Sequence, residues 1–178
     1  MPSPVGHALA GLATVGLASE RPGWRILTAL AVVGMLPDVD FLLPLQHRGP
    51  SHSLTAAGLA FAGALAVVSW REEPVRRVRL AMMVGAAYLS HSVLDWLGED
   101  TWTPMGIMAL WPFSNAFYVS GLDLFKAVDR RYWMPGFWGR NGVALLREIA
   151  ILAPILILSM YRSRVRFFDR ADRRRPSA

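Results

Sequence analysis

The sequence predicts an all-α protein, a polytopic transmembrane helical bundle of about five spans with a Trp-rich interfacial or re-entrant segment. Three observations predict this fold. Hydrophobic residues make up 53% of the chain and charged residues only 18%, so the balance is more apolar than that of an ordinary soluble domain. The apolar residues are gathered into runs close to the ~20 residues that a helix needs to cross a bilayer. Arginines cluster beside these runs, as the positive-inside rule expects of a membrane protein.

The first two candidate spans lie near the N-terminus. Residues 4–19 form a short run of small apolar residues that begins beside His7. No basic region precedes this run, so we expect it to stay in the protein and not to be cleaved as a signal peptide. Residues 26–45 are apolar until Asp38 and Asp40, and the proline of the same "LPDVD" motif is expected to end or kink the helix.

The other three candidate spans are residues 53–70, 80–97 and 143–161. The first of them carries no charge at all. The second is apolar apart from a histidine and a carboxylate near its far end, and the third holds an Arg–Glu pair near its start. The recurring Gly and Ala of these runs suit helices that pack closely in a membrane.

Residues 98–142 differ from the spans, because they hold most of the tryptophans, several Pro and Gly, and scattered charges. This composition is typical of loops and of a segment lying at the headgroup level. The apolar stretch 105–122 is an alternative crossing, but Pro112, Ser114 and Asn115 interrupt it.

The arginine-rich loop 71–79 and the basic C-terminal tail set the orientation, because positively charged loops stay in the cytoplasm. Counting back from them, the model places the N-terminus outside and requires that residues 105–122 do not cross. It also places Lys126, Arg130, Arg131 and Arg140 outside, against the rule. We expect one integral membrane domain over residues 1–165 and a disordered cytoplasmic tail over 166–178, in the inner membrane of a bacterium.

The composition also excludes several classes of site and partner. The chain has no cysteine, so disulfides, iron–sulfur clusters and thiolate zinc sites are excluded. The net charge of +6 lies in clusters that flank membrane spans and face anionic headgroups. We therefore expect no nucleic-acid partner, and the sequence leaves the oligomeric state open.

Placed in this topology, all four histidines and most of the carboxylates of the spans lie at the outer end of the bundle. The topology rests on arginines alone, so this convergence is an independent result. Ionisable groups at membrane depth are costly and usually functional. The residues that converge are His7, Asp38, Asp40, His47, Arg48, His52, His91, Asp95 and Glu148.

The residue types and one spacing indicate a divalent metal. His91 and Asp95 are four residues apart, so on a helix they share a face and can hold one ion. Imidazole and carboxylate ligands suit zinc, our first choice, as well as manganese or iron. Arg48 offers a planar fork to an anionic group such as phosphate.

Each feature also has an ordinary structural interpretation. A histidine at a membrane interface is often only a polar residue at headgroup level. The "LPDVD" carboxylates suit a helix cap or a turn, and His91 with Asp95 suits a hydrogen-bonded pair between packed helices. Glu148 suits an ion pair with Arg147. It is the combination that favours a metal site.

The order "GHALAG", "LPDVD", "HRGPSHS", "HSVLD" and "WPFS" resembles the YdjM-like family of membrane-bound, metal-dependent hydrolases, from His7 to about Ser114. The resemblance implies a hydrolytic metal centre. Ser51 stands where the family usually has Thr, and Gly98 stands where a Thr commonly follows the "LD" pair. The residues that match the family's polar signature are His7, Asp38, Asp40, His47, His52, His91 and Asp95.

We therefore expect a membrane hydrolase in which a metal-activated water attacks a phosphoester or similar bond of a lipid-like substrate at the outer membrane face. Phosphoesters are the first guess because the HxxxD helix pattern is also similar to one in zinc-dependent phospholipases C. The expected metal ligands are His52, His91, Asp95 and Asp40, then His7 and Asp38. His47, Arg48 and Glu148 are the expected catalytic residues. The alternatives are a metal-handling or transport protein and a non-catalytic envelope protein with a structural metal site.

Overall fold

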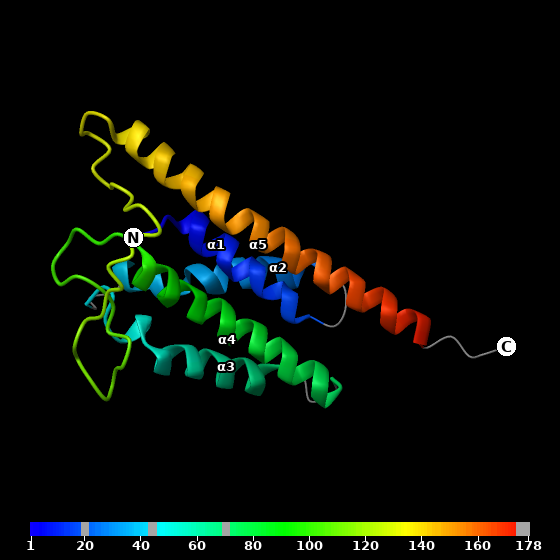
Figure 1. The fold of residues 1–178 in the computed structure, drawn as a ribbon. Helices are drawn as coiled ribbons and strands as arrows, with labels where there is room; N and C mark the ends of the chain where they lie inside the picture. The colour runs from blue at the N-terminus through cyan, green and yellow to red at the C-terminus, as the bar shows by residue number, and fades with distance from the viewer. Residues whose placement is uncertain (19–21, 43–45, 69–71, 174–178) are drawn as a thin grey trace.

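The computed structural model describes residues 1–18, 22–42, 46–68 and 72–173 (Figure 1). Within these residues it contains five α-helices and no strand, so the predicted all-α class is confirmed. Short 3₁₀ helices follow or precede several of the α-helices. The elements in order are α1 Pro4–Ala13, η1 Thr14–Leu17, α2 Trp24–Met35, η2 Leu36–Leu42, η3 Pro50–His52, α3 Leu54–Val67, α4 Pro74–Leu97 and α5 Phe137–Arg173.

Local sequence signals explain where the helices begin. Ser3 caps α1, because its hydroxyl accepts a hydrogen bond from the amide of Gly6 and a proline follows at the first helical position. Ser53 caps α3 in the same way, by accepting from Ala56. Pro74 begins α4. Two of the helices that carry the polar end of the molecule are therefore fixed by their own caps.

Two of the helices are long and apolar enough to cross a membrane, judged by length and composition: α4, and α5 from Phe137 to Ser163. Pro4–Leu17 and Leu54–Val67 are apolar but shorter. All five predicted spans contain a helix, whereas crossing by five of them is not established by these lengths. Helix α5 continues to Arg173, into the segment 166–178 that we expected to be disordered, and residues 174–178 lie outside the described residues.

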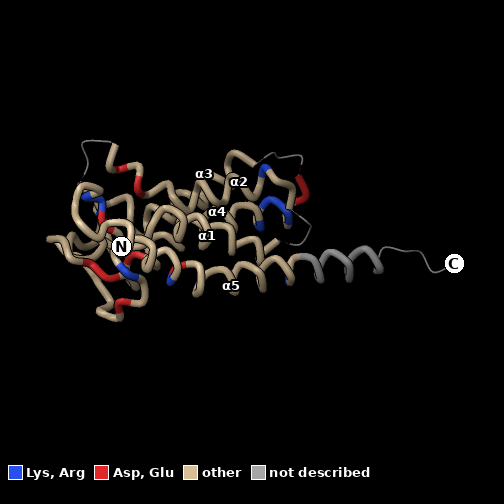
Figure 2. Tube along the Cα trace, turned by 90° about the horizontal axis from the view of Figure 1, so that it is seen from above, with Lys and Arg blue, Asp and Glu red and all other residues tan. Residues whose placement is uncertain are grey.

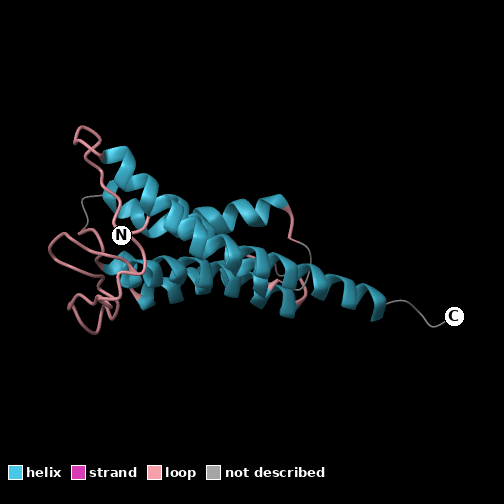
Figure 3. Cartoon of the chain, turned by 45° about the horizontal axis from the view of Figure 1, so that its top comes forward, coloured by secondary structure: helices cyan, strands magenta, loops and turns pink. Residues whose placement is uncertain are grey.

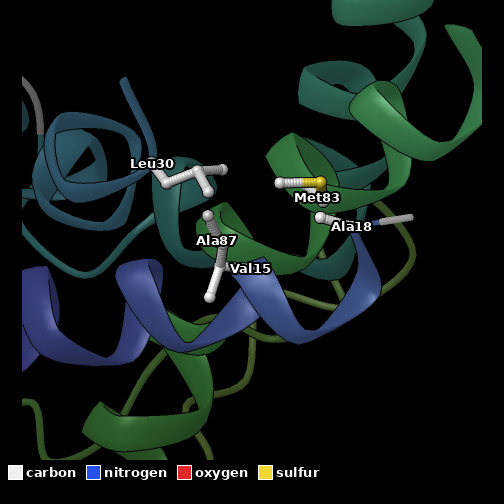
Figure 4. Packing of buried hydrophobic residues seen from close by; sticks show 5 residues of the cluster. All are labelled: Val15, Ala18, Leu30, Met83 and Ala87. Atoms are coloured by element: carbon white, nitrogen blue, oxygen red, sulfur yellow. The ribbon is translucent and has the colours of Figure 1, made fainter. Parts of the chain in front are cut away.

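The helices pack as a bundle in which α1, α2 and α4 contact one another, α5 covers α1 and η1, and α3 lies along α4. Figure 4 shows one apolar cluster at their meeting point, formed by Val15, Ala18, Leu30, Met83 and Ala87. Small residues bring the backbones of α1 and α2 close together. A β-carbon added to Gly11 would lie 2.4 Å from the Leu30 carbonyl oxygen.

Gly34 is the tightest point of this packing on the α2 side, and its replacement by alanine is expected to destabilise the bundle. An added β-carbon would lie 2.5 Å from the His7 carbonyl oxygen, so the helices must separate. Overpacking of this kind costs about 1–3 kcal/mol. Thermal unfolding of the detergent-purified Gly34→Ala variant measures the loss. Gly58→Ala is the control, because nothing lies within 4 Å of the added carbon there. Equal stability of the two variants would contradict the close contact.

Residues 98–136 contain no helix and fold over one end of the bundle, where the loops gather in Figure 3. Backbone hydrogen bonds hold this segment to the helix ends. Ala109 accepts from Leu54, the first residue of α3, and Trp96 near the end of α4 accepts from Ser120. Residues 105–122 therefore form part of a cap on one end of the bundle and do not run along its length.

Candidate metal centre

The end of the bundle beneath this cap brings together five of the predicted ligands. His7 lies on α1, Asp38 on η2 and His52 on η3, while His91 and Asp95 lie one turn apart on α4. Three overlapping groups of side chains have donor atoms close enough to share an ion: His7 with Asp38 and His91, Asp38 with His47 and His52, and His52 with His91 and Asp95. The four residues other than Asp38 and His47 are at most 1% exposed.

The hydrogen-bond partner of His91 Nδ1 decides which ring nitrogen of a neutral His91 carries the proton. Its Nδ1 faces the carbonyl oxygen of Gly34 at 2.8 Å, and a carbonyl only accepts hydrogen bonds, so Nδ1 must carry the proton. A neutral His91 therefore presents a lone pair at Nε2. The carbonyl fixes both the tautomer and the direction of the ring, as partners behind metal-binding histidines do.

The same reasoning fixes His52. Ser51 donates its hydroxyl proton to Asp40 Oδ2 at 2.8 Å, so its oxygen can only accept from His52 Nδ1 at 3.0 Å. Asp40 Oδ2 itself lies 3.4 Å from the same Nδ1. Nδ1 of His52 therefore donates, and Nε2 of a neutral His52 also presents a lone pair.

The two Nε2 atoms lie close to each other, and each lies close to two carboxylate oxygens. The Nε2 atoms of His52 and His91 lie 3.1 Å apart, and Asp95 Oδ2 lies 3.3 and 3.4 Å from them. Asp38 Oδ1 lies 3.7 and 3.5 Å from the same two nitrogens. Acceptors at such distances repel one another unless a cation, or a proton on one of the nitrogens, lies among them. Ligands around a tetrahedral zinc, with bonds of about 2.0–2.1 Å, lie about 3.3 Å from each other, which matches the distances among His52, His91 and Asp95.

The electrostatics of the centre agree with a cation. Burial alone would lower the pKa of the His52 imidazole, but the carboxylates of Asp38 and Asp95 raise it above its ordinary value, so a negative potential prevails there. Neither oxygen of Asp95 accepts a hydrogen bond from any residue that the structure describes. A fully buried carboxylate without hydrogen-bond donors is costly, and a bound metal would remove that cost.

His7 lies at the edge of this centre. Its ring stacks on that of His91, with centroids 3.7 Å apart, and its Nε2 lies 3.4 Å from Asp95 Oδ1. Its Nδ1 is buried and has no hydrogen-bond partner among the described residues. His7 is therefore placed to complete the coordination or to hold a second ion together with Asp38.

Asp40, predicted as a ligand, lies beside Nδ1 of His52, the ring nitrogen opposite Nε2, and belongs to none of the three groups of donor atoms. Its Oδ1 accepts from His47 Nδ1 at 2.8 Å, and its Oδ2 accepts from the amide of Arg48 and from Ser51. A carboxylate with this many donors orients its neighbours. His47 keeps its Nε2 free of described hydrogen-bond partners.

Arg48, predicted to hold an anionic group, is paired with the Asp100 carboxylate and directed at the Pro104 carbonyl oxygen, 3.3 Å away. Its backbone has a φ of 63°, a left-handed conformation that turns the loop back toward Asp40. Its charge is thus balanced within the cap.

A comparison with models of protein families identifies the family of the chain. The model of the family described as "YdjM inner membrane protein" matches residues 1–168. The chain belongs to this family. No curated protein and no solved structure matched the chain.

In this YdjM-family chain Glu148, predicted as a catalytic residue, belongs to none of the three groups of donor atoms. It is fully buried on α5, accepts from the amide of Ser3 at 2.6 Å, and accepts the hydroxyl proton of Ser3 as well. It therefore ties α5 to the cap of α1, four residues before His7.

We expect Glu148→Leu to lower stability and to leave the number of bound metal ions unchanged. The substitution leaves the buried amide of Ser3 without an acceptor, at a cost of about 1–3 kcal/mol. Glu148→Gln, which keeps one acceptor oxygen, should lose less. Thermal unfolding and metal analysis of both purified variants check this. Loss of metal from Glu148→Gln without loss of stability would instead favour a direct role at the centre.

Several residues of the YdjM-family site were not predicted. The Gly34 carbonyl orients His91, and Asp100 balances Arg48. Neither had a signal in the sequence, because a backbone carbonyl has no residue type and Asp100 was only one of several scattered charges. Ser51 stood out in "HRGPSHS", but its role between Asp40 and His52 depends on the fold.

Proposed function

We propose that this protein is an integral membrane, metal-dependent hydrolase that acts on a phosphoester or similar bond of a lipid-like substrate. One observation carries the proposal: the Nε2 atoms of His52 and His91 and the Oδ2 atom of Asp95 lie 3.1–3.4 Å from one another, the spacing of zinc ligands. A centre built from imidazole and carboxylate favours zinc, with manganese or iron as alternatives. Membership of an inner membrane protein family supports the setting.

The proposed division of labour among the residues follows from their contacts. His52, His91 and Asp95 would hold the ion, with Asp38 and His7 completing its surroundings. A bound divalent ion would act as a Lewis acid and lower the pKa of water toward ~7. Asp40 accepts the Nδ1 proton of His47, so His47 Nε2 has a lone pair with which to take up a proton. Asp38, whose side chain is 28% exposed, lies on the accessible side.

The proposed orientation has five crossings, the centre on the extracytoplasmic side and the C-terminus in the cytoplasm. Figure 2 supports it, because acidic residues gather at the end that holds the N-terminus, while α4 begins with arginines at the opposite end. Arg131 and Arg140, on the outer side of this topology, both pair with Asp129. The Arg131 and Arg140 guanidiniums hold the pKa of that half-buried carboxyl below its usual range, so these charges are balanced locally.

The test is an activity screen of the purified protein in detergent or nanodiscs with radiolabelled total lipid extract. We expect a water-soluble headgroup product, and the lipid left without its headgroup, to appear with zinc or manganese and to disappear with chelator. The His91→Ala/Asp95→Ala variant should form none. A wild-type protein that binds no metal after loading would overturn the proposal, as would the same product from the double variant.

A structural metal site is the second candidate, because the four side chains His7, His52, His91 and Asp95 are all but inaccessible. A structural ion has a closed coordination shell, whereas a catalytic ion keeps one open position. Spectroscopy of the cobalt-substituted protein separates the two. A spectrum that changes on adding an anion such as phosphate supports the enzyme, and an unchanging four-coordinate spectrum supports the structural site.

A further inference from the structure

A cavity of about 290 Å³ lies next to the metal centre, between α3, α4 and the part of the cap around residues 107–118. His52 contributes to its lining, so the cavity and the centre share a wall. Leu89 and Val93 of α4 line one side, and Ile107 and Ala109 of the cap line the other. The backbone hydrogen bond from Leu54 to Ala109 fixes the cap over the start of α3.

The surface of this cavity is almost wholly apolar. None of its described lining residues is Asp, Glu, Lys or Arg. Three large apolar side chains at its border, Leu54, Trp96 and Leu110, are between 41% and 53% exposed, so the cavity continues into an apolar outer surface. In a membrane protein such a surface meets lipid chains.

Besides His52 and Tyr118, one further polar residue lies in this lining. Ser92 on α4 is 3% exposed, and its hydroxyl oxygen has no hydrogen-bond partner among the residues that the structure describes. A buried hydroxyl that lacks a partner costs free energy unless a ligand or water supplies one. Ser92 directly follows His91, so this hydroxyl lies beside the metal centre and in the wall of the cavity.

We propose that this cavity binds the first part of an acyl chain of an ester lipid, with the Ser92 hydroxyl donating a hydrogen bond to the ester carbonyl oxygen. This inference rests on the proposed function, since it places the headgroup bond of the same lipid at the metal centre. It names the substrate class as an acylated phospholipid and assigns the chain-binding wall to α3, α4 and residues 107–118.

The chemistry of the wall favours an acyl chain over other occupants. A peptide would need partners for its backbone groups, which this lining does not supply. A soluble charged substrate would meet no opposite charge within the cavity. The volume lies at the lower end of the ~300–1,000 Å³ of small-molecule sites, so only part of a chain fits and the rest lies in the bilayer.

The test uses a phosphatidic acid probe whose acyl chain carries a diazirine near the ester, with the full-length metal-loaded protein in nanodiscs. After irradiation, we expect mass spectrometry to find label on residues 107–118 and on α4 near Val93. Label on the exposed Ile157 of α5 reports ordinary contact with lipid and serves as the internal standard.

Ala109→Phe fills the cavity and should reduce the label on residues 107–118 relative to Ile157 by tenfold or more. Ala62→Phe makes the same change at an exposed position of α3 and should leave the ratio unchanged. Ser92→Ala should reduce capture of the ester probe roughly fivefold, the worth of one hydrogen bond, and leave capture of an ether-linked probe unchanged. Metal content and melting temperature of each variant show whether the fold is intact.

The two proposals fail separately. Equal labelling of wild type and Ala109→Phe, with metal bound to both, would overturn the acyl-chain site and leave the metal centre standing. A wild-type protein that binds no metal would overturn the proposed function, whichever residues the probe labels. If Ala109→Phe loses both the label and the metal, Val93→Trp takes its place, because it fills the cavity from α4. Its label on residues 107–118 is again compared with that on Ile157.

Discussion

Asp95→Asn is expected to abolish tight metal binding. Asp95 Oδ2 lies within 3.4 Å of both ligand nitrogens, and its Oδ1 lies 3.4 Å from His7, so this one carboxylate faces three histidines. Asparagine keeps the size of the side chain and removes its charge. Loss of a residue that only orients a ligand costs ~10–100-fold in metal affinity, so loss of a direct, charged ligand should exceed about 100-fold. Competition with a chromophoric chelator measures the affinity of the purified variant.

The control is Asp123→Asn, which makes the same chemical change in an exposed carboxylate of the loop segment. Asparagine also tolerates the positive φ of that position. Its metal affinity should equal that of the wild type. Both variants must retain the helical circular dichroism of the wild type, so that a loss of metal is not a loss of fold. Wild-type affinity in a folded Asp95→Asn variant would contradict the centre described above.

The existence and order of the helices were predictable, because each apolar run of the sequence contains one helix of the fold. Their lengths were less predictable. Residues 26–45 were expected to form one span with its helix ended or kinked at the "LPDVD" proline; the α-helix ends two residues before that proline, at Met35, and the proline lies within the 3₁₀ helix that follows. Proline lacks an amide proton and restricts the residue before it, which favours this change of helix type.

The meeting of the histidines and aspartates was predictable from topology, since the ends of neighbouring spans must share one face of the bundle. The roles of individual residues were not. Arg48 pairs with Asp100, 52 residues away in the sequence, and Glu148 accepts a hydrogen bond from Ser3, 145 residues away. Whether a charged side chain is balanced within the protein or available to a substrate depends on such distant partners, which a single sequence does not reveal.

The contacts of Asp40 lead to a second, graded prediction: Asp40→Asn should weaken metal binding by ~10–100-fold, less than Asp95→Asn does. Asp40 accepts from His47, Arg48 and Ser51, and its carboxylate lies 3.4 Å from His52 Nδ1. An amide at this position offers one acceptor oxygen and turns an NH₂ group toward donors. The His52 ring then loses the partner that holds its Nε2 lone pair toward the metal.

Chelator competition across wild type, Asp40→Asn and Asp95→Asn tests this order directly. An Asp40→Asn affinity midway between the other two assigns Asp40 to the residues that position the ligands. A loss as large as that of Asp95→Asn would make Asp40 a direct ligand, because removing an orienting group leaves the ion's own bonds in place. Cobalt spectra sharpen the distinction: loss of a ligand changes the coordination bands of the bound ion, whereas loss of an orienting carboxylate lowers occupancy with little change in their positions. The order of these affinities thus reports which carboxylate touches the ion and which one holds the imidazole behind it.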